Sequence, residues 1–78
     1  MAVVRVPEEA WGDVEAEGLL NRWLVPEGAR VAAGQPIAEV VIVKSTMEVA
    51  APRDGTLTRV LVPEQGTFGR GQDLAIVD

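Results

Sequence analysis

Short apolar stretches rich in Val, Leu, Ile and Thr alternate along the chain with turns that contain Pro and Gly. Turn signals occur at residues 26–28, 33–34, 52–55 and 64–66. The stretches between them predict six strands, over residues 2–6, 19–25, 37–42, 47–50, 56–62 and 74–77. Many short strands separated by such frequent turns predict an all-β fold, either a sandwich or a flattened barrel.

An internal repeat divides the chain into two similar halves. Residues 18–40 align with residues 55–77 at a constant offset of 37, with eleven identities in twenty-three positions and no gaps. The longest shared block is LVPE, which begins at Leu24 and again at Leu61. The repeat also argues against a helix over residues 14–23, because the second half of that stretch aligns with a predicted strand. We expect residues 1–78 to form a single domain.

The stretch IVKSTMEV, residues 42–49, places the only lysine of the chain, Lys44, between two apolar runs. Apolar residues fall at even numbers before it and at odd numbers after it, so one continuous strand would have to bury a glutamate. A hairpin avoids this problem. The predicted pairs across it are Ile42 with Met47, Val40 with Val49, and Ala38 with Ala51. Residues 43–46 then form a four-residue loop with Lys44 at the tip, although this loop lacks Gly, Asn, Asp and Pro.

Composition excludes several classes of chemistry. The chain has no Cys and no His, so disulfides, thiolate zinc sites and the usual nucleophilic triads are ruled out. Its net charge of −5 opposes binding to nucleic acid backbones. No apolar run is long enough to cross a bilayer, and the N-terminal residues lack the features of a signal peptide. We therefore expect a soluble, cytoplasmic protein that has no catalytic residues, no metal and no membrane partner.

Two stretches resemble a known family of carrier domains. EGLLNRWLVPEGARVAAGQPIAEV is similar to the first half of lipoyl domains, and KSTMEVAAPRDGTLTRVLV resembles the segment that follows their modified lysine. Nearly the whole chain thus resembles the biotinyl/lipoyl-carrier family, in particular the lipoyl domains of 2-oxo acid dehydrogenase complexes. The resemblance implies a barrel-sandwich hybrid of two four-stranded sheets related by a quasi-twofold axis. It also implies that Lys44, in a turn with Val43, Ser45 and Thr46, carries lipoic acid through an amide bond.

The resemblance implies a swinging-arm carrier of acyl groups and electrons, not an enzyme. A lipoate-attaching enzyme would load Lys44. The lipoyl group would then serve three components of the complex: a thiamine-diphosphate decarboxylating dehydrogenase, an acyltransferase that uses coenzyme A, and the flavoprotein dihydrolipoyl dehydrogenase. The protein itself would supply attachment, orientation and recognition. The isolated domain is expected to be a monomer.

The residues around the lysine depart from the lipoyl pattern. Lipoyl domains usually have an acidic residue directly before the lysine and another two residues earlier, where this chain has Val43 and Val41. Biotin carriers usually have methionines on both sides of the lysine, where this chain has Val43 and Ser45. A biotin carrier of a carboxylase or decarboxylase, and an unmodified structural adaptor of the same fold, are therefore alternatives. Our hypothesis is that Val43 replaces an acidic contact to the partner with an apolar one.

Three further residues are candidates for partner recognition: Trp11, Val41 and Glu48. Trp11 lies in an N-terminal insertion that, by the family resemblance, forms a surface loop near the lysine. Trp23 aligns with Val60 in the repeat and is predicted to lie in the core. Acidic residues surround Trp11, at positions 8, 9, 13, 15 and 17. They either steer a partner or form an ordinary solvated surface.

Overall fold

The computed structural model describes residues 1–13 and 15–78, which form an all-β structure with one short 3-10 helix, η1 (Glu8–Ala10). The strands are β1 (Ala2–Val4), β2 (Gly18–Trp23), β3 (Arg30–Val31), β4 (Pro36–Ile42), β5 (Ser45–Ala50), β6 (Gly55–Val60), β7 (Thr67–Phe68) and β8 (Ala75–Val77). No helix among the described residues is long and apolar enough to cross a membrane.

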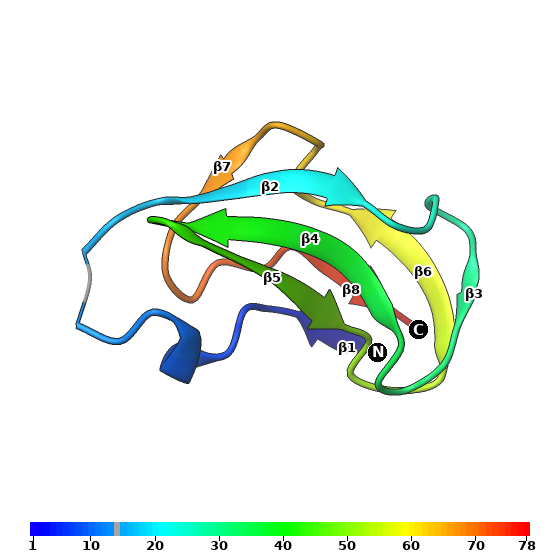
Figure 1. Ribbon diagram of the computed structural model, residues 1–78. Coiled ribbons are helices and arrows are strands. Elements are labelled where there is room, and N and C mark those ends of the chain that lie inside the picture. The colour runs from blue at the N-terminus through cyan, green and yellow to red at the C-terminus, as the bar shows by residue number, and fades with distance from the viewer. Residues whose placement is uncertain (14) are drawn as a thin grey trace.

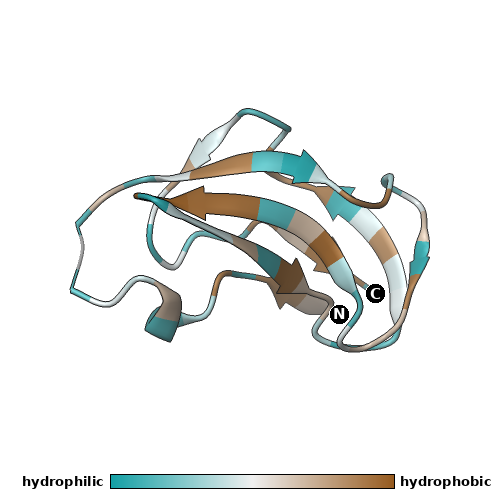
Figure 2. Cartoon of the chain, in the orientation of Figure 1, coloured by the Kyte–Doolittle hydropathy of each residue, from teal (hydrophilic) through white to brown (hydrophobic). Residues whose placement is uncertain are grey.

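The strands form two four-stranded antiparallel sheets, ordered β5-β4-β2-β7 and β1-β8-β6-β3 (Figure 1). The apolar bands along the strands in Figure 2 supply the core between the sheets. Its largest fully buried side chains include Leu20 and Ile37 from one sheet and Leu57 and Val77 from the other. Burial of this apolar surface is the main stabilising contribution, and it confirms the predicted sandwich of two sheets.

The offset of 37 residues found in the sequence relates one sheet to the other. It carries β2 onto β6 and β3 onto β7, and the two sheets have matching strand orders. Backbone contacts follow the same rule: Gly28 N donates to Leu57 O, and Gln65 N donates to Leu20 O, each at 2.6 Å. Because each bond is the repeat counterpart of the other, the predicted quasi-twofold symmetry is confirmed.

The repeated LVPE block has a structural reason. Its glutamates each accept a hydrogen bond from a backbone N–H in the other half of the molecule. Glu27 Oε2 lies 2.8 Å from Val60 N, and Glu64 Oε1 lies 3.1 Å from Trp23 N. Val60 and Trp23 are themselves repeat counterparts. The two carboxylates therefore clamp the two halves together in a reciprocal way, with charge-assisted bonds.

The structure contains all six predicted strands, with ends shifted by up to two residues. Two strands of only two residues each, β3 and β7, were not predicted. A stretch this short has no alternation to detect, and these strands exist because a partner strand lies beside them. The predicted preference for strand over helix is confirmed where the structure describes the chain, because β2 occupies residues 18–23.

Candidate functional site

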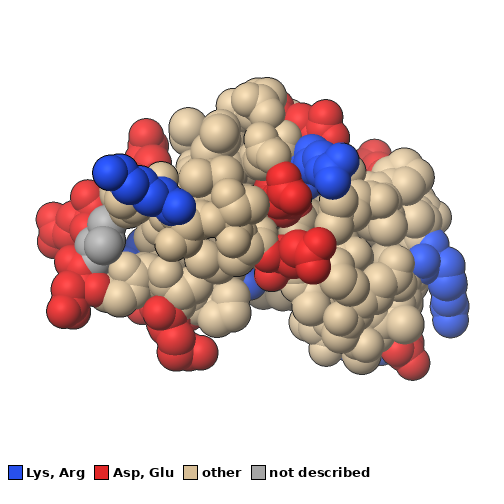
Figure 3. All heavy atoms as spheres, viewed as in Figure 1, with Lys and Arg blue, Asp and Glu red and all other residues tan. Residues whose placement is uncertain are grey.

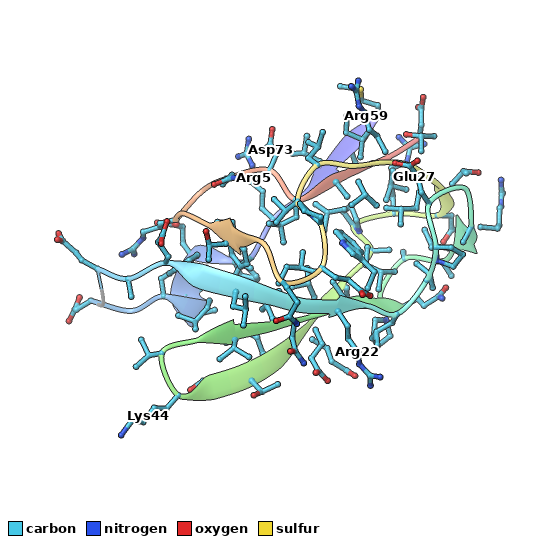
Figure 4. All side chains as sticks on the ribbon, turned by 90° about the horizontal axis from the view of Figure 1, so that it is seen from above. Arg5, Arg22, Glu27, Lys44, Arg59 and Asp73 are labelled. Carbon is cyan, nitrogen blue, oxygen red and sulfur yellow. The ribbon has the colours of Figure 1, made fainter. Side chains whose placement is uncertain are left out.

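The hairpin of β4 and β5 places Lys44 at one end of the molecule. Figure 1 shows its turn at the left-hand end, whereas both termini lie toward the other end. Lys44 is exposed, and in Figure 4 its side chain extends from the turn away from the two sheets. It forms no ion pair with any described residue. The hairpin therefore presents an accessible side-chain amine at this end of the molecule.

The turn is shorter than the sequence predicted. Strand pairing continues to Ile42 and Ser45, so only Val43 and Lys44 connect the strands. The four-residue loop and its register are thus wrong. The observed pairs are Ile42 with Ser45, Val41 with Thr46, Val40 with Met47, Glu39 with Glu48, and Ala38 with Val49. The tighter turn brings Ser45 and Thr46, which the predicted loop would have left unpaired, into the strand pairing of the hairpin.

The short turn imposes an unusual backbone conformation on Val43. Its φ is +58°, and Lys44 is not among the residues with positive φ. These signs are those of a type II′ turn, whose first central position normally holds Gly. A β-branched residue is disfavoured there, because its Cβ substituents crowd the backbone. No local signal in the sequence predicts this conformation, since turn rules would not place valine at such a position.

The alternation within the hairpin explains which residues face the core. Val40, Ile42 and Val49 are buried, and Met47 packs against the core while partly exposed. Glu39 and Glu48 do not join this core; Glu48 is exposed, and Glu39 is half-buried. The alternation of apolar residues therefore predicted the hairpin and its faces correctly, although it missed the register.

A polar contact on the outer side of the hairpin was not predicted. Glu39 Oε1 accepts a hydrogen bond from Asn21 Nδ2, and Arg22 Nε lies 3.9 Å from the same oxygen. Both partners come from β2, the neighbouring strand. They reduce the repulsion between Glu39 and the directly opposite Glu48. Only the pairing of β2 with β4 could have revealed them, and the sequence does not specify that register.

The remaining candidate residues lie in different environments. Ser45 and Thr46 are exposed beside the turn, and Val41 is half-buried. Trp11, in contrast, is only 2% exposed and packs edge-to-face on Phe68, with ring centroids 5.8 Å apart. Its indole is part of the core and does not offer a partner a surface. The insertion that contains it was expected to form a surface loop, but its tryptophan anchors it.

The acidic residues near Trp11 lie at the hairpin end of the molecule. Their side chains are exposed, and Figure 3 shows acidic groups gathered at this end. One of them, Glu8, is paired with Arg70, whose Nε lies 3.1 Å from Glu8 Oε1. Trp23, the other tryptophan, is partly buried against the core as predicted, and its Nε1 donates to Val62 O at 2.9 Å.

The chemistry available to the described residues is narrow. They contain no group of three or more carboxylates that could hold a metal ion, and they enclose no pocket. What the site offers is one exposed lysine on a two-residue turn at the end of a packed sandwich. Such an amine fits a covalently attached group, because acylation needs access to Nζ and disturbs no packed contact.

Comparisons with known proteins agree with this geometry. The model of the biotin/lipoyl family, described as "Biotin-requiring enzyme", matches residues 2–77. The dihydrolipoyllysine-residue acetyltransferase component of the pyruvate dehydrogenase complex from Rhizobium meliloti is 49% identical over 53 residues, which are 68% of this chain and 12% of that protein. The corresponding protein of Zymomonas mobilis is 35% identical over 75 residues, 95% of this chain and 17% of its own length.

Two further proteins extend the comparison. The pyruvate dehydrogenase E1 component subunit beta of Rhizobium meliloti is 46% identical over 53 residues, 68% of this chain and 11% of that subunit. The lipoyl domain of the 2-oxoglutarate dehydrogenase complex from Azotobacter vinelandii has the same fold, with a TM-score of 0.78 and 24% identity over 99% of this chain and 96% of that domain. The chain spans less than a fifth of the length of these three curated relatives. Since the family model covers nearly every residue, the chain belongs to the biotin/lipoyl family.

Proposed function

We propose that this protein is a lipoyl carrier domain and that Lys44 is the residue to which lipoic acid is attached. The observation that carries the proposal is the position of the only lysine, exposed at the tip of a two-residue turn. The names of the curated relatives, which include dihydrolipoyllysine-residue acetyltransferases, support lipoate over biotin.

The residues of this chain would bind and present the cofactor. In the loading step, the Lys44 ammonium first loses a proton; the neutral Nζ then bonds to the activated carboxyl carbon of the cofactor, the bond from that carbon to its leaving group breaks, and Nζ releases a second proton. Lysine loses its positive charge in this step, which takes the formal net charge from −5 to −6. When bound, lipoic acid supplies a dithiolane that takes up an acyl group and electrons.

The fold would hold the attachment point still while the arm moves. The turn is short, and the residues that flank it pair directly across β4 and β5, so Lys44 starts from a rigid base. The four methylenes of its side chain give the arm reach and rotational freedom. Tethering in this way raises the effective concentration of the cofactor at each partner's site.

The partners follow from the relatives at the level of a complex. They are a lipoate-attaching enzyme, and the decarboxylating dehydrogenase, acyltransferase and dihydrolipoyl dehydrogenase components of a 2-oxo acid dehydrogenase complex. The exposed carboxylates at the hairpin end suit partners with basic surfaces, since opposite charge accelerates association. We place the protein in the cytoplasm as part of the same proposal.

The test is intact mass after incubation with lipoate, ATP and a lipoate ligase, and separately with biotin, ATP and a biotin ligase. We expect a lipoyl increment on the wild-type chain and none on the Lys44→Arg variant, which keeps the charge but lacks an acylable amine. Urea denaturation should give both proteins the same stability within about 0.5 kcal/mol, since the residue is exposed. A mass increase with the biotin ligase alone would identify biotin, not lipoate, as the cofactor. No mass increase with either ligase would contradict a carrier role.

A further inference from the structure

We propose that Val43 is a specificity-determining residue for the loading of Lys44: its apolar side chain contacts an apolar surface of the attaching enzyme. This inference rests on the proposed function, because it concerns the enzyme that acts on Lys44. It adds a second residue to a site for which the chemistry alone requires only the lysine.

The first observation is the exposure of Val43. It is 57% exposed, and the other exposed large hydrophobic residues are the N-terminal Met1 and Leu61, among those that the structure describes. Val43 thus adds nothing to the core, and an apolar side chain in water gains nothing from its position. Burial of the Val43 side chain by a partner would gain the hydrophobic free energy that its exposed position does not provide.

The second observation is the backbone conformation of the same residue. Val43 has a φ of +58°, where glycine is the usual residue of a short hairpin turn. Glycine occupies most of the other positions with positive φ, such as Gly28 and Gly34, whose φ values are +95° and +84°; among the described residues the one other exception is Gln65, at +67°, which is not β-branched. Valine at the turn is therefore unfavourable both for the backbone and for solvation. Strain that packing does not explain points to a functional constraint.

The third observation is the position of Val43 relative to the reacting atom. An attaching enzyme must bring Nζ of Lys44 itself into its active site, so its surface comes within one lysine side chain of the turn. Enzymes that act on the cofactor reach it at the far end of a longer arm. The preceding residue is therefore within the contact area of the attaching enzyme, which makes this enzyme the partner best placed to bind Val43.

The neighbouring surface extends the apolar contact onto the sheet. Val41 lies opposite Thr46 on one side and Leu19 on the other, and Leu19 lies opposite Thr67. Val41 and Leu19 are both half-buried. This cross-strand row lies next to the turn, and it carries no charge. An enzyme surface that accepts Val43 would meet this row next, whereas a charged surface would have no partner on it.

The experiment measures kcat/KM for lipoate loading by intact mass, together with the unfolding temperature, for four variants. Val43→Thr keeps the β-branched shape but replaces a methyl by a hydroxyl, so loading should fall about tenfold with an unchanged unfolding temperature. Val43→Ile keeps the apolar surface and should load within about twofold of wild type. Val43→Gly should unfold about 4 °C higher, because the strain is removed, and should load as slowly as Val43→Thr.

The fourth variant, Leu61→Thr, is the matched control, because Leu61 is 42% exposed and follows β6 in the other sheet. It should load at the wild-type rate. Equal loading of the wild type, Val43→Thr and Val43→Gly would overturn the proposed contact while leaving the carrier function intact. Slower loading of Leu61→Thr to the same extent as Val43→Thr would also overturn it. Absence of loading in the wild type would remove both proposals.

Discussion

The two ends of the sandwich are related by the repeat but are built differently. At one end, Val40 pairs with Met47 and the strands continue into the turn with Lys44. At the other, Val77, the repeat counterpart of Val40, pairs with Ala2 from the opposite end of the sequence. There the Met1 amine lies 3.6 Å from the Asp78 carboxylate. At the hairpin end a turn joins β4 to β5, whereas no turn joins the paired strands β8 and β1 at the other end.

Under the proposed function, this difference places the carrier role at one end of the fold. The sheets and the core repeat, so they carry no information that distinguishes one end from the other. The connection between β4 and β5 does not repeat, and it contains the only lysine and the valine with positive φ on that turn. The scaffold thus supplies rigidity to both ends, and the turn supplies the reactive group to one.

The largest effect on stability is expected at two glycines that are counterparts in the repeat, Gly18 and Gly55. A Cβ at Gly18 would lie 2.5 Å from Phe68 Cζ, and one at Gly55 would lie 2.7 Å from Asp78 O. Phe68 is buried against Trp11. The carbonyl oxygen of Asp78 is a backbone atom that accepts a hydrogen bond from Thr56 N. We expect Gly18→Ala and Gly55→Ala each to lower the free energy of unfolding by about 3 kcal/mol, because neither the buried ring nor the hydrogen-bonded backbone can move away without loss.

Urea denaturation followed by tryptophan fluorescence would measure both glycine variants. Equal losses would mean that the repeated scaffold is packed equally tightly at the two positions, as the repeat predicts. A loss at one glycine and none at the other would contradict the description of a scaffold that is rigid at both ends.

A smaller effect is expected at the glutamates that join the two halves. Glu27→Ala and Glu64→Ala each remove one acceptor for a backbone N–H of the other half, so each should lower the free energy of unfolding by about 1 kcal/mol. Glu→Gln at the same positions keeps an oxygen acceptor and should cost less. The quasi-twofold symmetry predicts similar losses for the two sites. A loss at one site and none at the other would show that the two bonds contribute unequally.

Much of this fold could be predicted from the sequence because the repeat and the alternation are strong signals. The offset between Gly18 and Gly55 revealed the two halves, and the change of phase around Lys44 revealed the hairpin. Each of these patterns reflects which side chains are buried in the core, and burial of apolar surface is the main favourable contribution to folding. Lys44 could be singled out because it is the only lysine and because the change of phase places it in a turn.

What could not be predicted depends on contacts between distant residues. The two-residue turn requires positive φ at Val43, and local rules assign that conformation to glycine or asparagine. Strands β3 and β7 are paired segments too short to show a pattern. Trp11 lies outside the repeat, so nothing in the sequence indicated that Phe68 would cover it. In each case tertiary pairing decides the outcome.

The most direct test of where function lies uses the two primary amines of this chain, which lie at opposite ends: Nζ of Lys44 at the turn and the α-amine of Met1 beside Asp78. The wild-type protein would be loaded to completion with lipoate and a lipoate ligase, and fragmentation by mass spectrometry would locate the modification. We predict a single lipoyl group, entirely on Lys44. Modification of Met1, or no modification under conditions that load another lipoyl domain, would contradict the assignment of function to the hairpin end.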